Sequence, residues 1–576
     1  MKELNTVWGV GSASGCALGK AVVFTPKRQI VPRRIITDPE AELARLSKAR
    51  EEYGTELSLL YKQTLQKMDQ PSADIFLMYS MLLEDDDIID NIEQMVRTEH
   101  MNADYALQSE MKRLFELFSA VEDEYMRERS SDIENIANEL IMRMQGTNTS
   151  LEINKSKGKQ NLILVADVLT PADIVGLDRS CIKGVVSEHG SIHSHASILC
   201  RAMGMPMVVE AQGATYSITD GATVAVSGDT GEVVCEPDEA IIERYMAQIT
   251  EHDKQRHRYE KAADLKAVTL DGQELRVTVN IFSAEDLNKA DWDLIDGVGL
   301  YRSDFLYLSG KDYPSEAQLF RAYKSAAEKA KGRDVVISAF DIGGDKCADY
   351  MQLPKEENPF LGKRAIRICL ERPDLFCIQL RAVLKASAYG RVKLLLPMVS
   401  GTDEVKQTRH LLYRVMKQLK KENVHFDEHL PVGVMIETPA AVITSDVLAK
   451  TADFFSIGSN DLTQFILAAD RLNPQVEKLY DVCSPSVLRS IALVVRNAQK
   501  HKIPVSICGE AAGDTELIPL WAALRINELS VLPCDAAQVK YHVRQMHCNG
   551  IRASLDEVLC CTSADDVRRL LKKFSQ

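Results

Sequence analysis

The spacing of hydrophobic residues changes along the chain, and each spacing predicts a different kind of structure. Between residues 38 and 146 hydrophobic residues recur every three or four positions, as at Leu43, Leu46 and Tyr53. This period predicts amphipathic helices that pack on one another. Asp38 and Pro39 suit the start of the first helix, because Asp caps a helix and Pro fits its first turn. We therefore expect a bundle of at least about four helices here.

Short apolar runs on both sides of this region predict a small α/β domain. Residues 6–25 predict two short strands around glycines, and further strands are expected at 161–166, 183–187, 223–227 and 232–235. We expect the early strands to join the later ones, which makes the helical bundle an insertion into one domain. Residues 237–266 are charged and helical in pattern, and they are expected to form a linker.

From residue 270 onward, apolar runs alternate with helical stretches. Eight such runs in roughly 300 residues favour a (β/α)8 barrel, in which functional side chains lie at the carboxyl ends of the strands. The expected strands are 276–282, 297–301, 335–341, 392–399, 432–437, 454–458, 504–508 and 528–532. The polar residues at the ends of these runs or just after them are Arg302, Asp341, Glu437, Asn460, Asp461, Cys508 and Glu510.

The predicted fold class is therefore a multidomain α/β protein. A small α/β domain with an inserted α-helical bundle is followed by a (β/α)8 barrel. The expected boundaries are residues 1–30 and 147–236 for the α/β domain, 31–146 for the bundle, 237–266 for the linker and 267–576 for the barrel.

Charge and cysteine usage restrict the classes of partner. The 576 residues include 69 Lys and Arg against 83 Asp and Glu, a net charge of −14. A chain this acidic has no general attraction for nucleic acid or anionic membranes, so an anionic substrate needs a local cluster of Arg and Lys. The 13 cysteines form no C-x-x-C pair, which indicates reduced cytosolic thiols. With no secretory pattern at the start and no apolar run near ~20 residues, we expect a cytoplasmic protein without membrane insertion.

The stretch Glu188–Arg201 contains the first group of candidate catalytic residues. A strand ends near Ser187 and a helix is expected to start near His195, where the helix dipole opposes protonation of the imidazole and favours an attached phosphate. Imidazole is a recognised covalent nucleophile. Two other interpretations stay open: a capping or surface histidine, and a metal site formed by His189, His193 and His195.

Glu437 and Asp461 form the second group. Each follows one of two neighbouring predicted strands, so both carboxylates are expected on the same rim of the barrel. Mg²⁺ commonly takes one or two carboxylates and leaves its other positions to water and substrate phosphate. The alternative is that Asn460 and Asp461 only cap the following helix.

Basic residues and one thiol complete the candidate site. Arg302, Lys346, Arg364 and Arg471 each lie near a predicted strand end or rim loop, and Arg suits bidentate recognition of phosphate or carboxylate. Solvated surface charge is the alternative for these cations. Cys508 ends a strand beside the site and is a candidate proton donor, with a buried structural cysteine as the alternative.

Several long motifs resemble Enzyme I of the bacterial sugar phosphotransferase system, the phosphoenolpyruvate–protein phosphotransferase family, over essentially the whole chain. In the helical part they are Met81–Asp85 and Asp123–Arg129. In the barrel part they are Asp341-Ile-Gly-Gly-Asp-Lys346, Lys355–Gly362 with Arg364–Arg367, Glu437-Thr-Pro-Ala-Ala441, Phe455–Gln464 and Cys508-Gly-Glu510.

The resemblance implies a role for each candidate residue. His195 would take the phosphoryl group of phosphoenolpyruvate, and Cys508 would protonate enolpyruvate. Glu437 and Asp461 would hold Mg²⁺. The substrate-binding positions would be Arg302, Lys346, Arg364, Asn460 and Arg471. The α/β domain would be a swivelling phosphohistidine domain, the bundle would dock the small histidine phosphocarrier protein, and the barrel would bind phosphoenolpyruvate and form a homodimer.

Two positions depart from the family pattern. Ser338 stands where the family usually has a substrate-holding Arg, and the lost charge-assisted hydrogen bond costs about 1.5–3 kcal/mol. His193 stands where the family usually has a small hydroxyl residue. Ser338 therefore motivates an alternative function, a catalytically weakened paralogue that mainly binds or regulates the carrier. A pyruvate–phosphate dikinase is a third interpretation, but residues 38–146 are too short and too helical for its nucleotide-binding domain.

Overall fold

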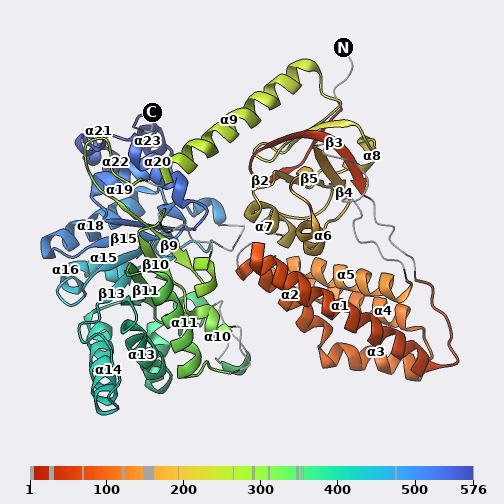
Figure 1. The fold of residues 1–576 in the computed structure, drawn as a ribbon, viewed down its shortest axis with the longest axis horizontal. Helices are drawn as coiled ribbons and strands as arrows, with labels where there is room; N and C mark the ends of the chain where they lie inside the picture. Colours follow the sequence, from red (N-terminus) through yellow and green to blue (C-terminus); the bar gives the residue numbers. More distant parts are fainter. Residues whose placement is uncertain are drawn as a thin grey trace. The chain divides into compact units, whose positions relative to one another are not determined.

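A computed structural model describes residues 5–24, 31–67, 70–119, 124–146, 161–192, 194–263, 265–288, 292, 294–308, 312–344, 349–351, 353, 356–471, 473 and 476–574 (Figure 1). The chain divides into two compact units, Met1–Gln255 and Arg256–Gln576. The first contains a mixed sheet and a helical bundle, and the second contains a closed parallel barrel. The predicted fold class is therefore confirmed.

An eight-stranded sheet lies in the first unit, in the order β1-β8-β7-β3-β4-β5-β6-β2. Strands β3, β4, β5 and β6 are parallel neighbours, and the other pairs are antiparallel. The strands are β1 (Asn5–Trp8), β2 (Val10–Ala13), β3 (Cys16–Phe24), β4 (Leu162–Ala166), β5 (Ile182–Ser187), β6 (Met207–Val209), β7 (Thr223–Ser227) and β8 (Glu232–Cys235). The carboxyl ends of β4 and β5 meet at one edge, directly before the loop that leads to His195.

The first stretch of the chain forms three strands, so the prediction of two was wrong. Gly9 separates β1 from β2, which pair at opposite edges of the sheet, with β8 and β6 respectively. The Gly9 N–H donates to the Gly231 carbonyl, and a Cβ on Gly9 would lie 2.3 Å from the Val209 carbonyl oxygen. Only glycine fits this close approach. The sheet must curl so that one residue bridges its two edges.

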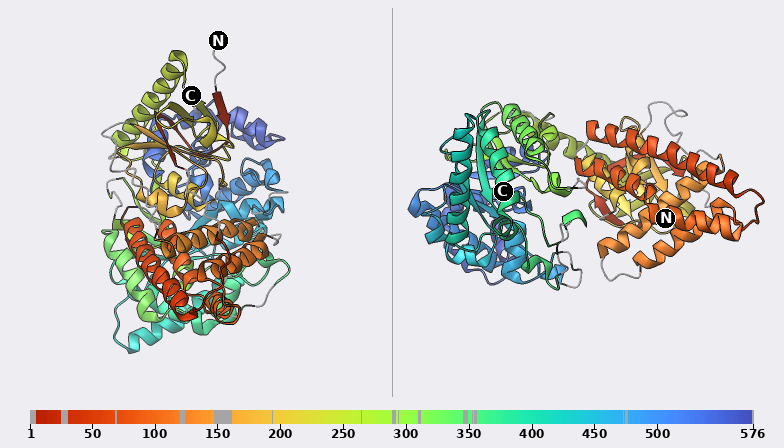
Figure 2. Two further views of the ribbon diagram at one scale, coloured as in Figure 1. Left: turned by 90° about the vertical axis from the view of Figure 1, so that its right-hand side faces the viewer. Right: turned by 90° about the horizontal axis from the view of Figure 1, so that it is seen from below.

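Among the described residues between β3 and β4, the structure has five long helices, so the predicted bundle is an insertion in the fold (Figures 1 and 2). Tyr53, Leu57 and Tyr79 lie in its buried core. This core is continuous with residues of the sheet and of the helices beside it, such as Leu164 and Leu199. The helices are α1 (Pro39–Lys67), α2 (Gln70–Leu83), α3 (Asp86–Glu99), α4 (Ala103–Ser119) and α5 (Glu124–Met144).

The second unit is built on eight parallel strands that close in the order β9 to β16, as predicted. They are β9 (Arg276–Ile281), β10 (Gly297–Tyr301), β11 (Asp334–Ser338), β12 (Arg391–Leu396), β13 (Val432–Ile436), β14 (Phe455–Gly458), β15 (Val505–Cys508) and β16 (Glu528–Val531). Strands β11 and β12 end three residues earlier than their apolar runs. Among the extra residues, Ala339 and Phe340 are buried without belonging to a strand. The two loops at this end of the barrel are therefore longer than the pattern predicts.

Helices cover the barrel and complete the first unit. In the first unit they are α6 (Pro171–Gly176), α7 (His195–Ala202) and α8 (Ala214–Ser217). The long α9 (Glu239–Ala263), which falls within the predicted linker, spans the boundary between the two units in the sequence. In the second unit they are α10 (Asp304–Leu308), α11 (Glu316–Lys329), α12 (Ile366–Glu371), α13 (Pro373–Ser387), α14 (Thr402–Lys421), α15 (Pro439–Ile443), α16 (Ser445–Leu448), α17 (Ser459–Leu467), α18 (Pro485–His501), α19 (Ile518–Leu524), α20 (Ala536–Gln545), α21 (Cys548–Ala553), α22 (Leu555–Cys560) and α23 (Ala564–Leu571). Across the described ranges, no helix has both the length and the apolar character needed to cross a bilayer.

Candidate active site

Charged side chains from several strand ends meet at the carboxyl rim of the barrel. Arg364 lies at their centre and is 1% exposed. Its Nε and Nη2 donate to the two carboxylate oxygens of Asp341 at 2.8 and 2.9 Å, and Nη2 also donates to Asp461 Oδ2 at 2.8 Å. Burial opposes the guanidinium charge, but the two carboxylates raise the pKa of Arg364 above its usual value. Arg364 thus binds a carboxylate that is 97 positions away from it in the chain.

The Asp341-Ile-Gly-Gly motif positions Arg364 through close backbone packing. Gly343 forms a β-bridge with Arg364 and has φ +102°. A Cβ on Gly343 would lie 2.2 Å from the Lys363 carbonyl oxygen. Ala365, directly after Arg364, has φ +54°, a conformation that costs a non-glycine residue about 1–3 kcal/mol. The loops therefore hold Arg364 in place at a cost in backbone strain, which is typical of functional sites.

Glu437 is a buried carboxyl group of the rim. It is 3% exposed, and its Oε1 accepts a 2.6 Å hydrogen bond from the Met398 N–H. Burial and the nearby charges of Asp461 and Asp341 raise its pKa to about 8, against the opposing effect of Arg364. Met398 itself has φ +57°. Glu437 and Asp461 are buried and Asp341 is partly buried, and the mutual repulsion of these carboxylates suits a divalent cation as their partner.

Two buried polar atoms of this group have no hydrogen-bond partner among the described residues. They are Arg364 Nη1 and Asp461 Oδ1. Asp461 Oδ1 lies 3.5 Å from Arg471 Nη1, which is an ion-pair distance. Arg302 lies near the same acids: burial opposes its charge, but Asp304, Asp341 and Asp461 raise its pKa. An unpaired buried donor beside further cations is suited to an anionic ligand, because such a donor is costly unless something binds it.

Cys508 ends β15 inside the barrel and is 2% exposed. Its sulfur accepts from Ser456 Oγ at 3.3 Å and lies 3.4 Å from the Ile457 carbonyl oxygen, to which the thiol can donate. Burial and the charge of Glu437 raise the pKa of Cys508 to about 12, although Arg302 opposes this. The group is therefore a protonated thiol at neutral pH. A thiol in this state can donate a proton to a strongly basic carbon.

The remaining barrel candidates lie at the edge of this group or outside the described residues. Asn460 contacts Glu510 twice: its Nδ2 donates to Glu510 Oε1 at 3.2 Å, and its Oδ1 accepts from the Glu510 N–H at 3.1 Å. Lys346 and the adjoining part of its loop lie outside the described residues. The hydroxyl of Ser338 is buried and donates to the Ala339 carbonyl at 2.8 Å, so this position contributes no charge.

His195 is the first residue of α7 in the other unit, as predicted. Ser194 caps this helix, and its Oγ accepts from the Ser197 N–H at 3.3 Å. The imidazole Nδ1 lies 3.2 Å from Oδ2 of Asp132, a residue of α5 in the bundle. The His195 side chain is 22% exposed, so the imidazole is partly accessible.

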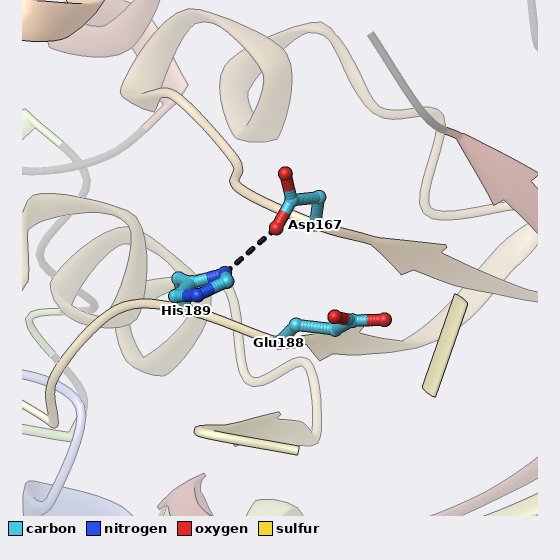
Figure 3. A group of neighbouring side chains, drawn as sticks. All are labelled: Asp167, Glu188 and His189. Carbon is cyan, nitrogen blue, oxygen red and sulfur yellow. Dashed lines mark hydrogen bonds and ion pairs between the residues drawn. The ribbon is translucent and has the colours of Figure 1, made fainter. Parts of the chain in front are cut away.

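His189 does not join His195 in a common group. Its Nδ1 lies 2.7 Å from Asp167 Oδ1, and the two residues form a cluster with Glu188 at the ends of β4 and β5 (Figure 3). Glu188 Oε1 accepts from both the N–H and the hydroxyl of Thr215. His193 lies outside the described residues. Within the part of the chain that the structure describes, His195 is therefore not a member of a cluster of three possible metal ligands.

Comparisons with known proteins give matches in both units of the chain. The family models for PEP-utilising enzymes match in three parts: the PEP-binding domain at residues 256–548, the N-terminal domain at 8–129 and the mobile domain at 158–231. A phosphoenolpyruvate-protein phosphotransferase from Priestia megaterium is 35% identical over 566 residues, which cover 98% of each chain. The chain belongs to the phosphoenolpyruvate-protein phosphotransferase family. It is an enzyme of that family, and its relative from Bacillus subtilis is 34% identical over all of both chains.

Solved structures also match part of this phosphotransferase. A solution structure of Enzyme I (nEIt) is 27% identical, covers 43% of this chain and 99% of its own, and has a TM-score of 0.37.

Several residues of the site were not assigned a role from the sequence. Asp341 was singled out only as a polar residue after a strand, yet it accepts both bonds that fix Arg364. The Met398 N–H, which binds Glu437, has no signal in the sequence because it is a backbone group in a strained loop. Asp132 carries no signal either, because its contact with His195 joins distant parts of the chain.

Proposed function

We propose that this phosphotransferase moves the phosphoryl group of phosphoenolpyruvate to His195 and from there to a small histidine phosphocarrier protein, as the first step of a sugar phosphotransferase system. The observation that carries the proposal is the barrel rim, where Arg364 offers an unpartnered buried Nη1 beside Arg302 and Arg471. This cluster provides the local positive charge that an acidic chain needs to hold a phosphorylated anion. The comparisons give no support to the weakened paralogue.

The proposed chemistry uses one nucleophile and one acid. The lone pair of an imidazole nitrogen of His195 attacks phosphorus, and the bond from phosphorus to the enol oxygen breaks. Arg302, Arg364 and Arg471 neutralise the charge of the phosphate and carboxylate of the substrate, with Lys346 and Asn460 proposed as further substrate-binding residues. The enolate that leaves takes a proton at carbon 3 from the Cys508 thiol, which gives pyruvate. The resulting thiolate regains a proton from solvent.

Glu437 and Asp461 are the proposed ligands of Mg²⁺. Their carboxylates lie in one buried group, and oxygen ligands are those that Mg²⁺ prefers. A bound divalent cation would supply Lewis-acid stabilisation of the substrate's phosphate oxygens. The cation would also relieve the repulsion between carboxylates that raises the pKa of Glu437.

We expect the affinity for Mg²⁺ to depend on pH. Because the pKa of Glu437 is raised to about 8, the metal must displace a proton from this carboxyl group at lower pH. Affinity should therefore rise about tenfold per pH unit up to about pH 8 and level off above it. Isothermal titration calorimetry with MgCl₂ between about pH 6 and pH 9 measures this. Equal affinity at both ends of the range would contradict the assignment of Glu437.

Replacing Cys508 by Ala should slow the proton transfer at carbon 3 of the substrate more than it slows the phosphoryl transfer. In the reverse direction the Cys508 thiolate removes a proton from pyruvate, so the exchange of ¹⁴C between pyruvate and phosphoenolpyruvate should fall by about 10²- to 10⁴-fold. A single round of phosphoryl loading should persist. Cys483→Ala, a change at another buried thiol of the same unit, is the matched control. An exchange rate that is equal in both variants excludes Cys508 as the acid.

Ser338→Arg tests the missing cation of the rim. Ser338 ends β11 and is 5% exposed, close to the loop that begins with Asp341. A guanidinium at this position should lower KM for phosphoenolpyruvate about tenfold, the lower limit for one charge-assisted hydrogen bond. An unchanged KM would mean that another cation already fills this role.

The proposed carrier, assembly and location rest on the resemblance and on a few features of the first unit. Leu77 and Met81 lie one turn apart on α2 and are 38% and 56% exposed, as expected for a surface that docks a small protein. We also propose a cytoplasmic homodimer that forms through the barrel. Sedimentation velocity of the full chain at several concentrations would test the dimer.

The experiment that tests the function is direct. The purified chain is mixed with ³²P-labelled phosphoenolpyruvate, with Mg²⁺ or with excess EDTA, and then with a small histidine phosphocarrier protein. We expect label on the chain only with Mg²⁺, and its movement to the carrier within seconds to minutes. A chain that never takes up label would overturn the proposal.

A further inference from the structure

Gln379 is a buried amide on α13 that bonds to the ends of two neighbouring barrel strands. It is 0% exposed. Its Oε1 accepts a 3.1 Å hydrogen bond from the N–H of Phe340, two residues after the end of β11. Its Nε2 donates to the Ser338 carbonyl at 3.2 Å and to the hydroxyl oxygens of Ser303 and Tyr323, each at 3.0 Å. The two hydrogens of Nε2 are therefore shared among three acceptors.

The backbone fixes the orientation of this amide. A backbone N–H can only donate, so the atom that faces Phe340 must be the amide oxygen, and the nitrogen faces the other partners. Phe340 is 0% exposed and lies beyond Ser338, the last residue of β11 that pairs with β12. A buried N–H without a partner is costly. Gln379 thus supplies the acceptor that a neighbouring strand would supply in a longer ladder.

The contact with Ser303 connects the amide to Arg302. Ser303 is 0% exposed, and its Oγ donates to the Ser338 carbonyl at 2.7 Å. Ser303 directly follows Arg302 at the end of β10, and the Arg302 N–H donates to the Ile281 carbonyl at 2.8 Å. Hydrogen bonds on both sides therefore hold the main chain that carries the Arg302 guanidinium.

At the end of β11 the same amide lies next to the residue that holds Arg364. Phe340 directly precedes Asp341, whose two carboxylate oxygens accept hydrogen bonds from Arg364. The bond from the Phe340 N–H to Gln379 therefore restricts the main chain of Asp341 and, through its carboxylate, the guanidinium of Arg364. Gln379 itself bonds to backbone and hydroxyl groups, so its influence on a substrate passes through these neighbours.

We propose that Gln379 is a positioning residue of the substrate site, which joins the ends of β10 and β11 and so holds Arg302 and Arg364 where they bind phosphoenolpyruvate. This inference rests on the substrate-binding roles proposed above for the two arginines. Binding and rate fall steeply when a group that contacts the substrate is misplaced by about 1 Å, so a rigid support behind the cations is needed. The need is greater here because Ser338 contributes no charge to the rim.

Binding of phosphoenolpyruvate to the full chain measures this role without turnover. His195→Ala lacks the proposed nucleophile, so isothermal titration calorimetry with phosphoenolpyruvate and Mg²⁺ gives a dissociation constant. In this parent chain Gln379→Met, which keeps the length of the side chain and removes its hydrogen bonds, should raise the dissociation constant about tenfold or more. Ser303→Ala removes one bond of the network and should raise it about threefold.

Asn497→Leu is the matched control. Asn497 is a buried amide of the same unit, 5% exposed, and its Nδ2 donates to Ser445 Oγ at 2.8 Å. We expect Asn497→Leu to lower the melting temperature of the parent chain, as Gln379→Met does, and to leave the dissociation constant unchanged. If Gln379 only stabilised the fold, the two variants would behave alike.

Steady-state kinetics with His195 intact provides a second readout. Displaced cations weaken binding of the substrate, so Gln379→Met should raise KM for phosphoenolpyruvate about tenfold and keep kcat within about threefold of the wild-type value. A smaller folded fraction has the opposite signature, because it lowers the apparent kcat and leaves KM unchanged.

The outcomes separate this inference from the proposed function. Equal dissociation constants in the parent chain, Gln379→Met and Ser303→Ala would overturn the positioning role while binding of phosphoenolpyruvate remained. If Gln379→Met did not fold, an unchanged constant in Ser303→Ala alone would overturn it. A parent chain that bound no phosphoenolpyruvate would overturn the proposed function and this inference with it.

Discussion

Replacing His195 by Ala should abolish the uptake of label from phosphoenolpyruvate. The imidazole is the proposed nucleophile, and alanine offers no lone pair to phosphorus. Loss of an essential nucleophile removes the covalent intermediate altogether, so uptake should fall by at least about 10⁴-fold, to the background of the assay. The fold should survive, because the His195 side chain is 22% exposed and Ser194 still caps α7. Labelling with ³²P-phosphoenolpyruvate followed by filter binding measures the effect.

His189→Ala is the matched control for this variant. His189 lies in the same loop and faces Asp167 at 2.7 Å, as His195 faces Asp132, but its side chain is 59% exposed. We expect this variant to take up label to the same level as the wild type. Equal loss in both variants would mean that the loop is disturbed in general, and equal uptake in both would contradict the role of His195.

Removing the guanidinium of Arg364 should cause the second largest loss. Arg364→Met leaves Asp341 and Asp461 without their shared partner and removes the unpaired Nη1 that we assign to the substrate. Each charge-assisted hydrogen bond contributes about 1.5–3 kcal/mol. If the two N–H groups of Nη1 each donate one such bond to the substrate, their loss lowers kcat/KM by roughly a hundredfold or more. Steady-state release of pyruvate, measured with a carrier present, gives this value.

Arg364→Lys and Arg381→Met sharpen the interpretation. A lysine keeps the charge but cannot bridge two carboxylates in the planar geometry of a guanidinium, so most of the loss should remain. Arg381 pairs with Glu316 at the start of α11 and with Glu422 directly after α14, and neither acid is one that Arg364 binds. Arg381→Met should therefore keep its kcat/KM. A wild-type kcat/KM in Arg364→Met would contradict the placement of the substrate.

The strands of the barrel could be predicted because buried strands leave continuous apolar runs between helical stretches. The ends of β11 and β12 could not, since the apolar pattern reports burial and not backbone pairing. Ala339 and Phe340 are fully buried, yet they extend the rim loop beyond the last paired residue of β11. The division of the first stretch into β1 and β2 was also missed, because it depends on the approach of Gly9 to the distant Val209.

Part of the site could be predicted because apolar runs also mark where the barrel strands end. Glu437 and Cys508 were found because each stands at the end of a strand, where the barrel geometry brings side chains together. Asp132 was not found, because its contact with His195 depends on how the bundle packs on α7. The Met398 N–H was not found because sequence patterns do not reveal backbone donors in strained loops.

The most direct test of the central claim is to locate the phosphoryl group on the wild-type chain. The chain is loaded with phosphoenolpyruvate and Mg²⁺, digested at alkaline pH, and analysed by tandem mass spectrometry with fragmentation that preserves the bond between phosphorus and nitrogen. His189, His193 and His195 fall in one short stretch, so the fragment ions must separate them. The account predicts phosphate on His195 alone. Phosphate on His189 or His193, with His195 unmodified, would contradict it.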